Sequence, residues 1–461
     1  MVDLPVGQDD PGEQARLERA EAWLLRRELF GIRPGLDRMR LLLRRLGDPQ
    51  TAFGAIHVVG SNGKTSTATM AAALLERRGV RSGAYVSPHF VSFRERVLVG
   101  GVPAGAGLFA AAVDRVREAA EALEAAAADG SGEPTDGPVT QFEAVTAAAF
   151  LVLAAAGVEC AVVEAGLGGR WDATNVLPTH PTRDDGSPAP AVAVLTSISL
   201  EPTRWLGNTE AAIAAEKVAV LRPGGALVLA AGLSDDARAV AAHRAGEQDG
   251  RVVEADADPG PDVPTPGAAR YQRRNLATAI AAVGAFLGPA APGSAPAPRD
   301  PAAERDVATH VVVPGRFEVV EDGTGDESGV VVIQDGAHNE AGMVALAEAL
   351  DATRPARPLV AVLGVLADRD PVVMLRALAP RCDVLVATAP ANPRRLEAEA
   401  LGAAAAAAMP QLTTHVVPGA HDALARARTL AGPGGTVLVT GSLHLVADLR
   451  RGPGSAPGAS F

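Results

Sequence analysis

One stretch of this sequence constrains the fold more than any other. Between Ala55 and Arg78 a short β-branched apolar run, ending at Val59, is followed by a glycine-containing loop and then by an alanine-rich helical pattern. The loop residues are Gly60, Ser61, Asn62, Gly63, Lys64, Thr65 and Ser66. The pattern predicts a strand, a turn and a helix over Ala68–Arg78, with Gly79 suited to end it.

This order of elements is typical of a nucleotide phosphate site. Glycines let backbone N–H groups turn inward without a Cβ clash, the helix N-terminus adds partial positive charge, and Lys64 supplies a full charge. The spelling departs from the eight-residue phosphate-loop motif, because Val58 stands where that motif has its first glycine. The alternative is a strand-to-helix turn with a surface lysine. The strand and helix context favours a loop that binds a nucleoside triphosphate.

Length and composition set the broad class. At 461 residues, 48% of them apolar, the chain is long enough for two or three domains with their own cores. The longest apolar run, Ala144–Val158, is shorter than the roughly 20 residues that span a bilayer, so we expect a buried helix and no membrane association. The acidic, polar start of the chain does not resemble a signal peptide. A net charge of −12 without a clustered basic face argues against a nucleic-acid partner.

The cysteines indicate the compartment. Cys160 and Cys382 lie far apart in sequence, so neither a disulfide framework nor a zinc cluster is predicted. A reducing compartment fits best, and we expect a cytoplasmic protein.

Polar side chains follow two predicted strands downstream of the loop. A strand over Ser82–Val86 ends in Ser87-Pro88-His89, and a strand over Cys160–Val163 delivers Glu164 at its end. Because strand carboxyl ends in an open parallel sheet face the ligand crevice, both are expected near the nucleotide. A carboxylate beside a phosphate loop is a natural ligand for Mg²⁺, which prefers hard oxygen donors. The alternatives are a proline turn with an incidental histidine and a surface carboxylate.

A second α/β domain is predicted from near Ala308, which gives domains of residues 1–307 and 308–461. Two stretches rich in Pro, Ala, Gly and Asp, at Asp256–Pro266 and Pro289–Pro301, are expected to be loops or linkers. Beyond them strands alternate with helices again. The expected strands are Val330–Ile333, Leu359–Leu363, Val384–Ala387, Thr414–Val417 and Thr436–Val439. The first precedes Asp335-Gly336-Ala337-His338-Asn339, a cluster suited to a ribose or phosphate, although Asp-Gly is also an ordinary turn.

These residues together resemble the folylpolyglutamate synthase/dihydrofolate synthase family, the folate branch of the Mur ligase superfamily of ATP-dependent amide-forming ligases. The matching motifs are Gly35-Leu36-Asp37-Arg38, Gly60–Ser66, Ser87-Pro88-His89, Glu95-Arg96, Phe142-Glu143, Glu164–Arg170, Asp172-Ala173-Thr174-Asn175, Trp205-Leu206-Gly207, Glu216-Lys217, Gln272 with Asn275, Pro314-Gly315-Arg316, Asp335–Asn339, Asp368-Arg369-Asp370 and Thr440-Gly441-Ser442. The resemblance implies an α/β protein with a P-loop-containing N-terminal domain of the Mur-ligase central type and a smaller, Rossmann-like C-terminal α/β domain.

The resemblance also implies roles for matching residues. The loop Gly60–Ser66 would hold the β- and γ-phosphates of ATP, with Ser87 and Glu164 on Mg²⁺. Lys217 would match the carbamylated lysine of the family, in which an ammonium becomes an anionic oxygen ligand. The residues expected to contact ATP from the hinge and the second domain are Asn275, Arg316, Asp335 and His338. Those expected to border the pterin are Phe142, Glu143, Trp171, Asp172 and Ala173. Lys64, Lys217 and His338 are thereby the candidate catalytic residues.

The reaction that the resemblance implies joins L-glutamate to a folate or dihydropteroate. A substrate carboxylate attacks the γ-phosphate of ATP to give an acyl phosphate, and the amine of glutamate then displaces phosphate through a tetrahedral intermediate. Lys64 and the metal would neutralise charge on the transferring group, while closure of two domains aligns the amine with the acyl phosphate. The implied partners are these small molecules, and the resemblance implies a monomer.

Three positions depart from the family pattern. Where the family has Asp-His-Thr, this chain has Glu201-Pro202-Thr203, so the histidine that would bind a second Mg²⁺ is missing. Thr65 replaces the glycine usual in folate ligases and matches the peptidoglycan-precursor members, and Arg369 stands where lysine is frequent. One interpretation is drift, with Glu201 or water completing the metal shell. The others are an amide ligase of specialised metabolism with a non-folate acceptor, and a nucleotide-binding protein without catalysis. Whether the chain makes dihydrofolate, lengthens polyglutamate tails or does both is left open.

Overall fold

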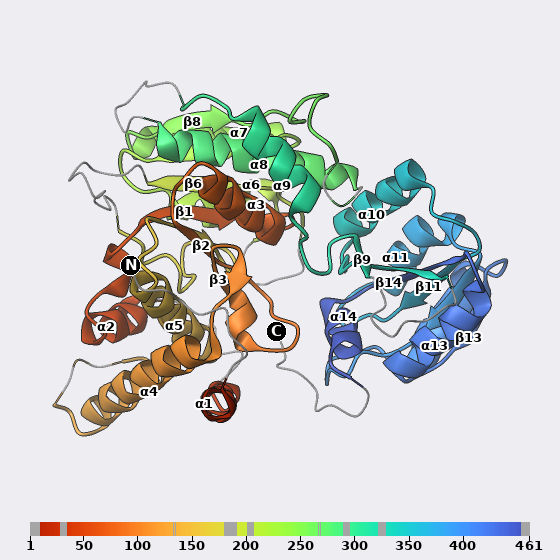
Figure 1. Cartoon of the computed structure of the whole chain (residues 1–461), viewed down its shortest axis with the longest axis horizontal. Helices are drawn as coiled ribbons and strands as arrows, with labels where there is room; N and C mark the ends of the chain where they lie inside the picture. The colour runs from red at the N-terminus through yellow and green to blue at the C-terminus, as the bar shows by residue number, and fades with distance from the viewer. Residues whose placement is uncertain are drawn as a thin grey trace. The chain divides into compact units, whose positions relative to one another are not determined.

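The computed structural model of the chain divides into two compact units (Figure 1). It describes residues 10–27, 35–131, 133, 135–178, 191–200, 207–265, 267, 269–288, 296–320 and 329–452. The first unit ends at Val263 and resumes over Arg274–Val307, and the second comprises Pro264–Arg273 and the chain from Ala308. The single boundary drawn from the sequence counted Pro264–Arg273 with the first domain. The structure groups this segment with the second unit because Ala269 and Tyr271 pack into that unit's core.

The first unit is built on an eight-stranded sheet with the order β4-β3-β2-β5-β1-β6-β7-β8. Its centre is β1 (Gly54–Val59), which runs parallel to β5 (Cys160–Glu164) on one side and β6 (Val192–Leu195) on the other. The remaining strands are β2 (Ser82–Tyr85), β3 (Val97–Val99), β4 (Val102–Pro103), β7 (Ala226–Leu229) and β8 (Arg251–Glu254). All six residues of β1 are buried, as expected for a central parallel strand covered on both faces.

Nine α-helices of the described residues precede the strands of this sheet, connect them or follow them in sequence. They are α1 (Pro11–Leu25), α2 (Asp37–Arg45), α3 (Lys64–Arg77), α4 (Ala106–Ala128), α5 (Gln141–Ala155), α6 (Glu210–Lys217), α7 (Asp235–Glu247), α8 (Arg270–Leu287) and α9 (Pro301–His310). Helices α1, α2, α4 and α5 gather beside one another, at the lower left in Figure 1. Within the described part of the chain, no helix is long and apolar enough to cross a membrane.

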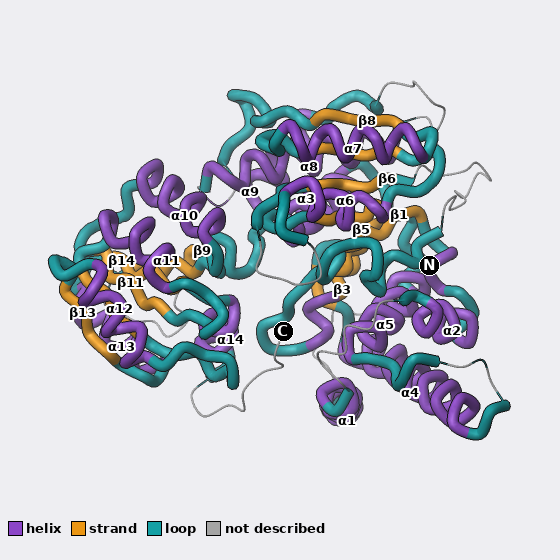
Figure 2. The backbone as a smooth tube through the Cα atoms, turned by 180° about the vertical axis from the view of Figure 1, so that it is seen from behind, coloured by secondary structure: helices purple, strands orange, loops and turns teal. Residues whose placement is uncertain are grey.

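The second unit is a six-stranded sheet with the order β13-β12-β11-β14-β10-β9. The strands are β9 (Glu318–Val320), β10 (Val331–Gln334), β11 (Leu359–Leu363), β12 (Val384–Ala387), β13 (Thr413–Val416) and β14 (Thr436–Thr440), and only the β9–β10 pair is antiparallel. The helices are α10 (Glu340–Thr353), α11 (Pro371–Leu378), α12 (Ala398–Ala408), α13 (Ala420–Ala431) and α14 (Leu443–Arg450). They flank the strands, as the helices and strands of Figure 2 show.

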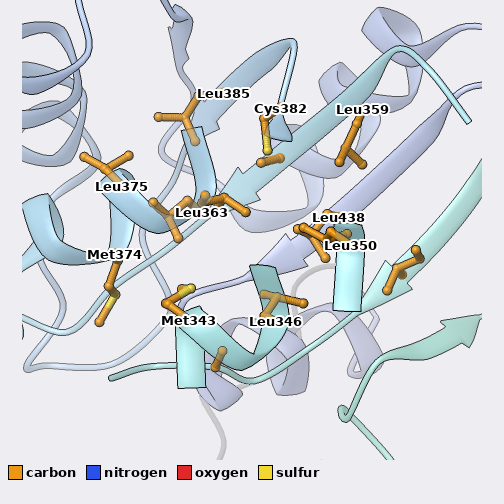
Figure 3. Close-up of a cluster of buried hydrophobic side chains, with 14 of the residues drawn as sticks. Met343, Leu346, Leu350, Leu359, Leu363, Met374, Leu375, Cys382, Leu385 and Leu438 are labelled. Atoms are coloured by element: carbon orange, nitrogen blue, oxygen red, sulfur yellow. The ribbon is translucent and has the colours of Figure 1, made fainter. Parts of the chain in front are cut away.

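A buried apolar cluster holds this second sheet to its helices (Figure 3). Met343, Leu346 and Leu350 of α10 meet Leu359 and Leu363 of β11 within it. Each fully buried side chain of this size contributes about 1.5–3 kcal/mol relative to exposure, so the cluster is sufficient to give the unit a core of its own.

The α/β prediction with two mainly parallel sheets is confirmed. All five strands expected in the second half are present within one residue of their predicted limits. The buried helix expected over the apolar run Ala144–Val158, with Thr140–Glu143 opening it, is α5, and Thr140 caps it. The helix after the glycine loop starts at Lys64 and not at Ala68, since Gly63 forms its N-cap.

Candidate functional site

The predicted phosphate loop connects β1 to α3 in the first unit. Gly60 leaves the strand where a Cβ would lie 1.9 Å from Thr196 Oγ1, so no side chain fits there. Gly63 has φ +84°, a conformation that glycine adopts without strain, and it forms the N-cap of α3. The first N–H groups of the helix therefore lie at the loop, where the helix dipole favours an anion.

Two lysines converge on this loop. Lys64 Nζ donates to the carbonyl of Gly60 at 3.0 Å, and Lys217 Nζ, from the end of α6, donates to the same carbonyl at 2.9 Å. Lys217 is only 2% exposed. These are the only lysines of the chain, in which every other strongly basic side chain is an arginine. Both lysine amines thus lie at the candidate phosphate site.

Residues after β6 fix the loop from the other side. Thr196 Oγ1 donates to the carbonyl of Asn62 at 2.7 Å, and Ser197 Oγ accepts from the N–H of Asn62 at 2.8 Å. The N–H of Ser61 donates to the carbonyl of Ser197 at 2.9 Å. The sequence interpretation missed Thr196 and Ser197, although their position at the end of a strand beside β1 is the signal that would have found them.

A set of oxygen atoms lies at the start of α3, where the sequence predicts a metal site. Glu164, at the end of β5, accepts from Thr65 Oγ1 at 3.1 Å and, through its other oxygen, from the N–H of Ser87 at 2.9 Å. Thr65 Oγ1 also lies 3.0 Å from the carbonyl of Ser87. The carboxylate is 3% exposed. The structure therefore brings together the two predicted metal ligands, Ser87 and Glu164, and adds Thr65 to them.

The donor set fits a hard divalent cation that is shared with a nucleotide. No group of three His, Cys, Asp or Glu side chains suited to a metal occurs in the described residues, so this part of the chain offers no closed cage of such side chains. One carboxylate and hydroxyl oxygens beside a phosphate loop are the ligands that Mg²⁺ uses when phosphate and water complete its shell.

Asn275 joins the loop from α8. A Cβ on Gly63 would lie 2.6 Å from Asn275 Oδ1, so this amide contacts the backbone of the loop. The sequence predicted Asn275 as a nucleotide contact at the hinge. The structure places it in the first unit, two residues beyond the segment that belongs to the second.

The residues expected to border the pterin occupy the first turn of α5 and the turn after β5. The Phe142 ring packs against Gly166, where a Cβ would lie 2.6 Å from Cζ, and its centroid is 6.3 Å from that of Tyr85. Trp171 is 53% exposed, whereas Asp172 and Ala173 are buried. Burial raises the pKa of Asp172, and hydrogen bonds from Thr174 and the N–H of Leu167 oppose that shift.

Glu143 makes structural contacts with both the helix cap and another helix. Its Oε2 accepts from the N–H and the hydroxyl of Thr140, at 2.8 and 2.9 Å, which completes the capping box of α5. The same oxygen accepts from Arg38 Nε of α2 at 2.8 Å, and both side chains are buried. The sequence gave Arg38 no partner, because 105 residues separate the pair.

The Ser-Pro-His cluster places its histidine in a buried pair. Arg96 Nε donates to His89 Nδ1 at 2.9 Å, and the His89 ring lies 4.2 Å from that of Phe93. Burial lowers the pKa of Arg96. His89 is therefore held by its neighbours, two residues from Ser87 in the metal-ligand set.

The second unit collects its own predicted residues around Asp335. Asp335 Oδ2 accepts from Tyr271 OH at 2.7 Å and from the N–H of Phe317 at 2.8 Å. Burial raises the pKa of Asp335, against the effects of the Tyr271 hydroxyl and the Arg316 charge. Burial, followed by the Asp335 carboxylate, holds the pKa of Tyr271 well above its usual value. His338 Nδ1 lies 2.8 Å from the carbonyl of Gly336, in the same turn.

The departure at Glu201-Pro202-Thr203, together with Arg204, Trp205 and Leu206, lies outside the described residues. The structure describes Arg369, whose Nε lies 3.8 Å from Asp368 Oδ1.

The fold and the site define a class: a ligase of Mur type, with an ATP-binding P-loop sheet and a separate α/β unit. Residues 315–443 match the family described as Mur ligase, glutamate ligase domain. The chain is 33% identical over 403 residues to the dihydrofolate synthase/folylpolyglutamate synthase of Mycobacterium tuberculosis H37Rv, covering 81% of this chain and 78% of that protein.

Solved structures agree with this match. The chain is similar to Mycobacterium tuberculosis folylpolyglutamate synthase complexed with ADP and AMPPCP, with 30% identity and a TM-score of 0.79 over 97% of this chain and 100% of the other. It is also similar to the Yersinia pestis bifunctional folylpolyglutamate synthase/dihydrofolate synthase complexed with AMPPNP and a Mn ion, with 26% identity, a TM-score of 0.73, and 96% and 98% coverage. The chain belongs to the dihydrofolate synthase/folylpolyglutamate synthase family, and the resemblance read from its motifs is confirmed.

Proposed function

We propose that this protein is an ATP-dependent ligase that joins L-glutamate to the carboxylate of a folate or dihydropteroate, with release of ADP and phosphate. One observation carries the chemistry: Glu164 and Thr65 present oxygen atoms 3.1 Å apart at the start of the helix that follows the phosphate loop. This arrangement is suited to a nucleotide–metal complex. The family supports the acceptor, because its members are named for folate and dihydrofolate synthesis.

In the first step, a carboxylate oxygen of the acceptor attacks the γ-phosphorus of ATP, and the bond to the β,γ-bridging oxygen breaks to release ADP. Charge develops on the transferring phosphoryl group. Lys64 and the N–H groups at the start of α3 stabilise it, as fixed donors do in phosphoryl transfer. A bound divalent ion, held by Glu164, Ser87 and Thr65, supplies further neutralisation of the phosphate charge.

In the second step, the uncharged amine of L-glutamate attacks the acyl carbon. The tetrahedral intermediate collapses with loss of phosphate and of one amine proton, and an amide remains. The glutamate ligase domain match over residues 315–443 supports the second unit as the part that binds the amino acid. We propose Arg316, Asp335 and His338 as its contacts to ATP, since they share one turn-rich cluster at the carboxyl end of β10.

The same proposal covers the pterin end of the acceptor. Phe142, Trp171, Asp172 and Ala173 are its proposed contacts, and the exposed ring of Trp171 supports an aromatic binding surface. We propose Mg²⁺ as the bound ion, a monomer as the oligomeric state and the cytoplasm as the compartment. Both cysteines are buried and neither is in a disulfide, which suits a reducing environment.

The test supplies purified protein with ATP, Mg²⁺, L-glutamate and either dihydropteroate or tetrahydrofolate, and measures ADP together with the mass of the product. We expect ADP release that requires both glutamate and the acceptor, and a product heavier by one glutamyl residue. Lys64→Met is the matched negative control. ADP release with another carboxylate, but none with either pterin compound, would overturn the folate acceptor. ATP binding without turnover on any acceptor would overturn the ligase.

A further inference from the structure

His57 is a polar side chain in an otherwise aliphatic strand. It lies on β1 between Ile56 and Val58, three residues before Gly60, with Val163 of β5 and Ala193 of β6 as its register partners. Its side chain is 4% exposed. Burying an imidazole among aliphatic strands is unfavourable unless the ring finds a hydrogen-bond partner.

The partner is a threonine in the turn after β5. His57 Nε2 lies 2.8 Å from Thr174 Oγ1, across 117 residues of sequence. Thr174 Oγ1 in turn donates to Asp172 Oδ1, and the N–H of Thr174 donates to the same oxygen at 3.0 Å. Thr174 and Asp172 are both buried. Three buried side chains thus form one chain of hydrogen bonds.

The number of available protons decides which group donates and which accepts in this series of hydrogen bonds. A threonine hydroxyl has one proton, and an ionised Asp172 only accepts, so the Thr174 proton points to Asp172. The Thr174 oxygen must then accept from His57, which places the imidazole proton on Nε2. Burial lowers the pKa of His57 to about 3, so the ring is neutral and carries one N–H.

Asp172 in turn holds the shape of its turn. Its second oxygen accepts from the N–H of Leu167 at 2.9 Å, so the carboxylate ties both ends of the segment 167–174 together. The same segment is held on another side by α6. Arg170 bonds the backbone carbonyl and the carboxylate of Glu216, at 3.0 and 2.8 Å, beside Lys217.

We propose that His57 is a positioning residue for the acceptor: through Thr174 it fixes the Asp172 carboxylate, and with it the turn that presents Trp171 and Ala173 to the pterin. This inference rests on the proposed function for its substrate, but its geometry lies within the first unit. It links the strand that leads into the phosphate loop to the turn that recognises the acceptor.

Two pairs of variants test the proposal in the full-length protein. His57→Leu and Thr174→Val each remove one link of the chain, while His57→Gln and Thr174→Ser keep a donor or a hydroxyl in place. We expect the first two to raise the KM for tetrahydrofolate or dihydropteroate about tenfold, the effect of one lost buried hydrogen bond. The Kd for ATP should stay within about twofold. The Gln and Ser variants should recover most of the lost affinity.

A double variant and a control sharpen the result. Because the two residues act in series, His57→Leu with Thr174→Val should be no worse than either alone. Thr436→Val is the control, since the Thr436 hydroxyl is buried without a hydrogen-bond partner in the described structure. It should leave both KM and Kd unchanged. An unchanged acceptor KM in Thr174→Val, or an equal loss of ATP affinity, would overturn the positioning role. If His57→Leu fails to fold, Thr174→Val, which keeps the side-chain volume, still tests the positioning role.

Hydrogen exchange separates this proposal from the proposed function. Amides of Leu167 and Thr174 should exchange about tenfold faster in His57→Leu and Thr174→Val than in the parent, with the Gly60–Ser66 loop unchanged. This readout needs no acceptor. Faster exchange without any folate turnover in the parent would reject the folate ligase but keep the hydrogen-bond chain. Folate turnover with unchanged exchange and unchanged acceptor KM would reject the positioning role alone.

Discussion

Thr65 Oγ1 lies 3.1 Å from Glu164 Oε1 and 3.0 Å from the carbonyl of Ser87, so one hydroxyl contacts both of the proposed metal ligands, which follow two different strands. It has one proton and therefore donates to only one of them at a time. Its other lone pair is available to a cation held by Glu164. The departure from glycine at this position thus adds an oxygen donor to the site.

This contact predicts a metal phenotype for Thr65. Thr65→Val removes the hydroxyl at nearly constant volume, and we expect the Mg²⁺ concentration for half-maximal activity to rise about tenfold, since a lost contact of this kind is worth about 1.4 kcal/mol. Thr65→Ser should keep the parent value. Titration of activity with Mg²⁺ at saturating ATP measures this. A Val variant with the parent titration would show that the hydroxyl serves the loop and not the ion.

Gly63 and Gly79 give a matched pair at the two ends of α3. Both have left-handed φ, +84° and +78°, so an alanine should cost about 1 kcal/mol of stability at either position. Only Gly63 has a neighbour in the way, because its Cβ would lie 2.6 Å from Asn275 Oδ1, whereas nothing lies within 4 Å of Gly79. We therefore expect Gly63→Ala to lower ATP affinity about tenfold and Gly79→Ala to leave it unchanged. Urea unfolding measures the stability of the two variants, and nucleotide titration measures their ATP affinity. Equal ATP affinities would mean that Asn275 gives way without consequence.

The elements of this site that could be predicted are those set by local pattern. The glycine loop and Lys64 follow from spacing within one βα unit, and Glu164 follows from its place at the end of a separate strand. The structure places the loop and this carboxylate together. The long helix α4 was not predicted, and the start of α3 was placed four residues late. Specific side-chain contacts between distant parts of the chain could not be predicted from the sequence. His57 meets Thr174 across 117 residues and Arg38 meets Glu143 across 105, and neither pair has a signal in its own neighbourhood.

The Arg38–Glu143 pair predicts that Glu143 acts mainly on stability. Removing one partner of a buried ion pair leaves the other charge uncompensated, so Glu143→Ala should destabilise the protein by about 3–5 kcal/mol. Phe142→Ala is the comparison, and we expect it to raise the acceptor KM more than Glu143→Gln does. Thermal unfolding and acceptor titrations on the same preparations distinguish them. A stable Glu143→Gln with a strongly raised acceptor KM would assign Glu143 to the substrate instead.

His444 in the second unit predicts a loss of stability in acid. Burial, and then the charge of Arg394, lowers the pKa of His444 from 6.5 to about 4. Its stabilising contribution is complete above pH 6.5, and it is lost as the pH falls towards 4, because the unfolded chain gains a proton that the folded chain excludes. The loss reaches about 3 kcal/mol.

A comparison of two histidine variants isolates that contribution. His444→Gln removes the titrating group next to Asn392, so the free energy of unfolding should fall less between pH 7 and pH 4 than in the parent. His243→Gln is the control, since the side chain of His243 is 79% exposed. Urea unfolding at both pH values provides the measurement. Parallel pH profiles for the parent and His444→Gln would contradict the assignment.

The use of lysine at positions 64 and 217 predicts that at least one of these sites needs a reactive amine, which arginine cannot provide. All its other strongly basic side chains are arginine, yet Lys64 and Lys217 both reach the Gly60 carbonyl. A lysine amine can lose its proton and react with carbon dioxide, whereas a guanidinium stays protonated. We expect Lys217→Arg to be as inactive as Lys217→Ala. Only the alanine variant leaves space for a small carboxylic acid to replace a carbamate, so acetate or formate should partly restore its turnover.

The scarcity of lysine makes the modification directly measurable. With ¹³C-labelled carbon dioxide, the carbamate signals of the chain are limited to Lys64, Lys217 and the terminal amine. A single carbamate signal from a buried group that disappears in Lys217→Ala and persists in Lys64→Met would assign the carbamate to Lys217. A labelled signal that survives Lys217→Ala, with no rescue by acetate or formate, would leave Lys217 as an unmodified ammonium that supports the loop. In that case its bond to Gly60 is its function, and Lys217→Ala should weaken ATP binding about as much as Gly63→Ala does.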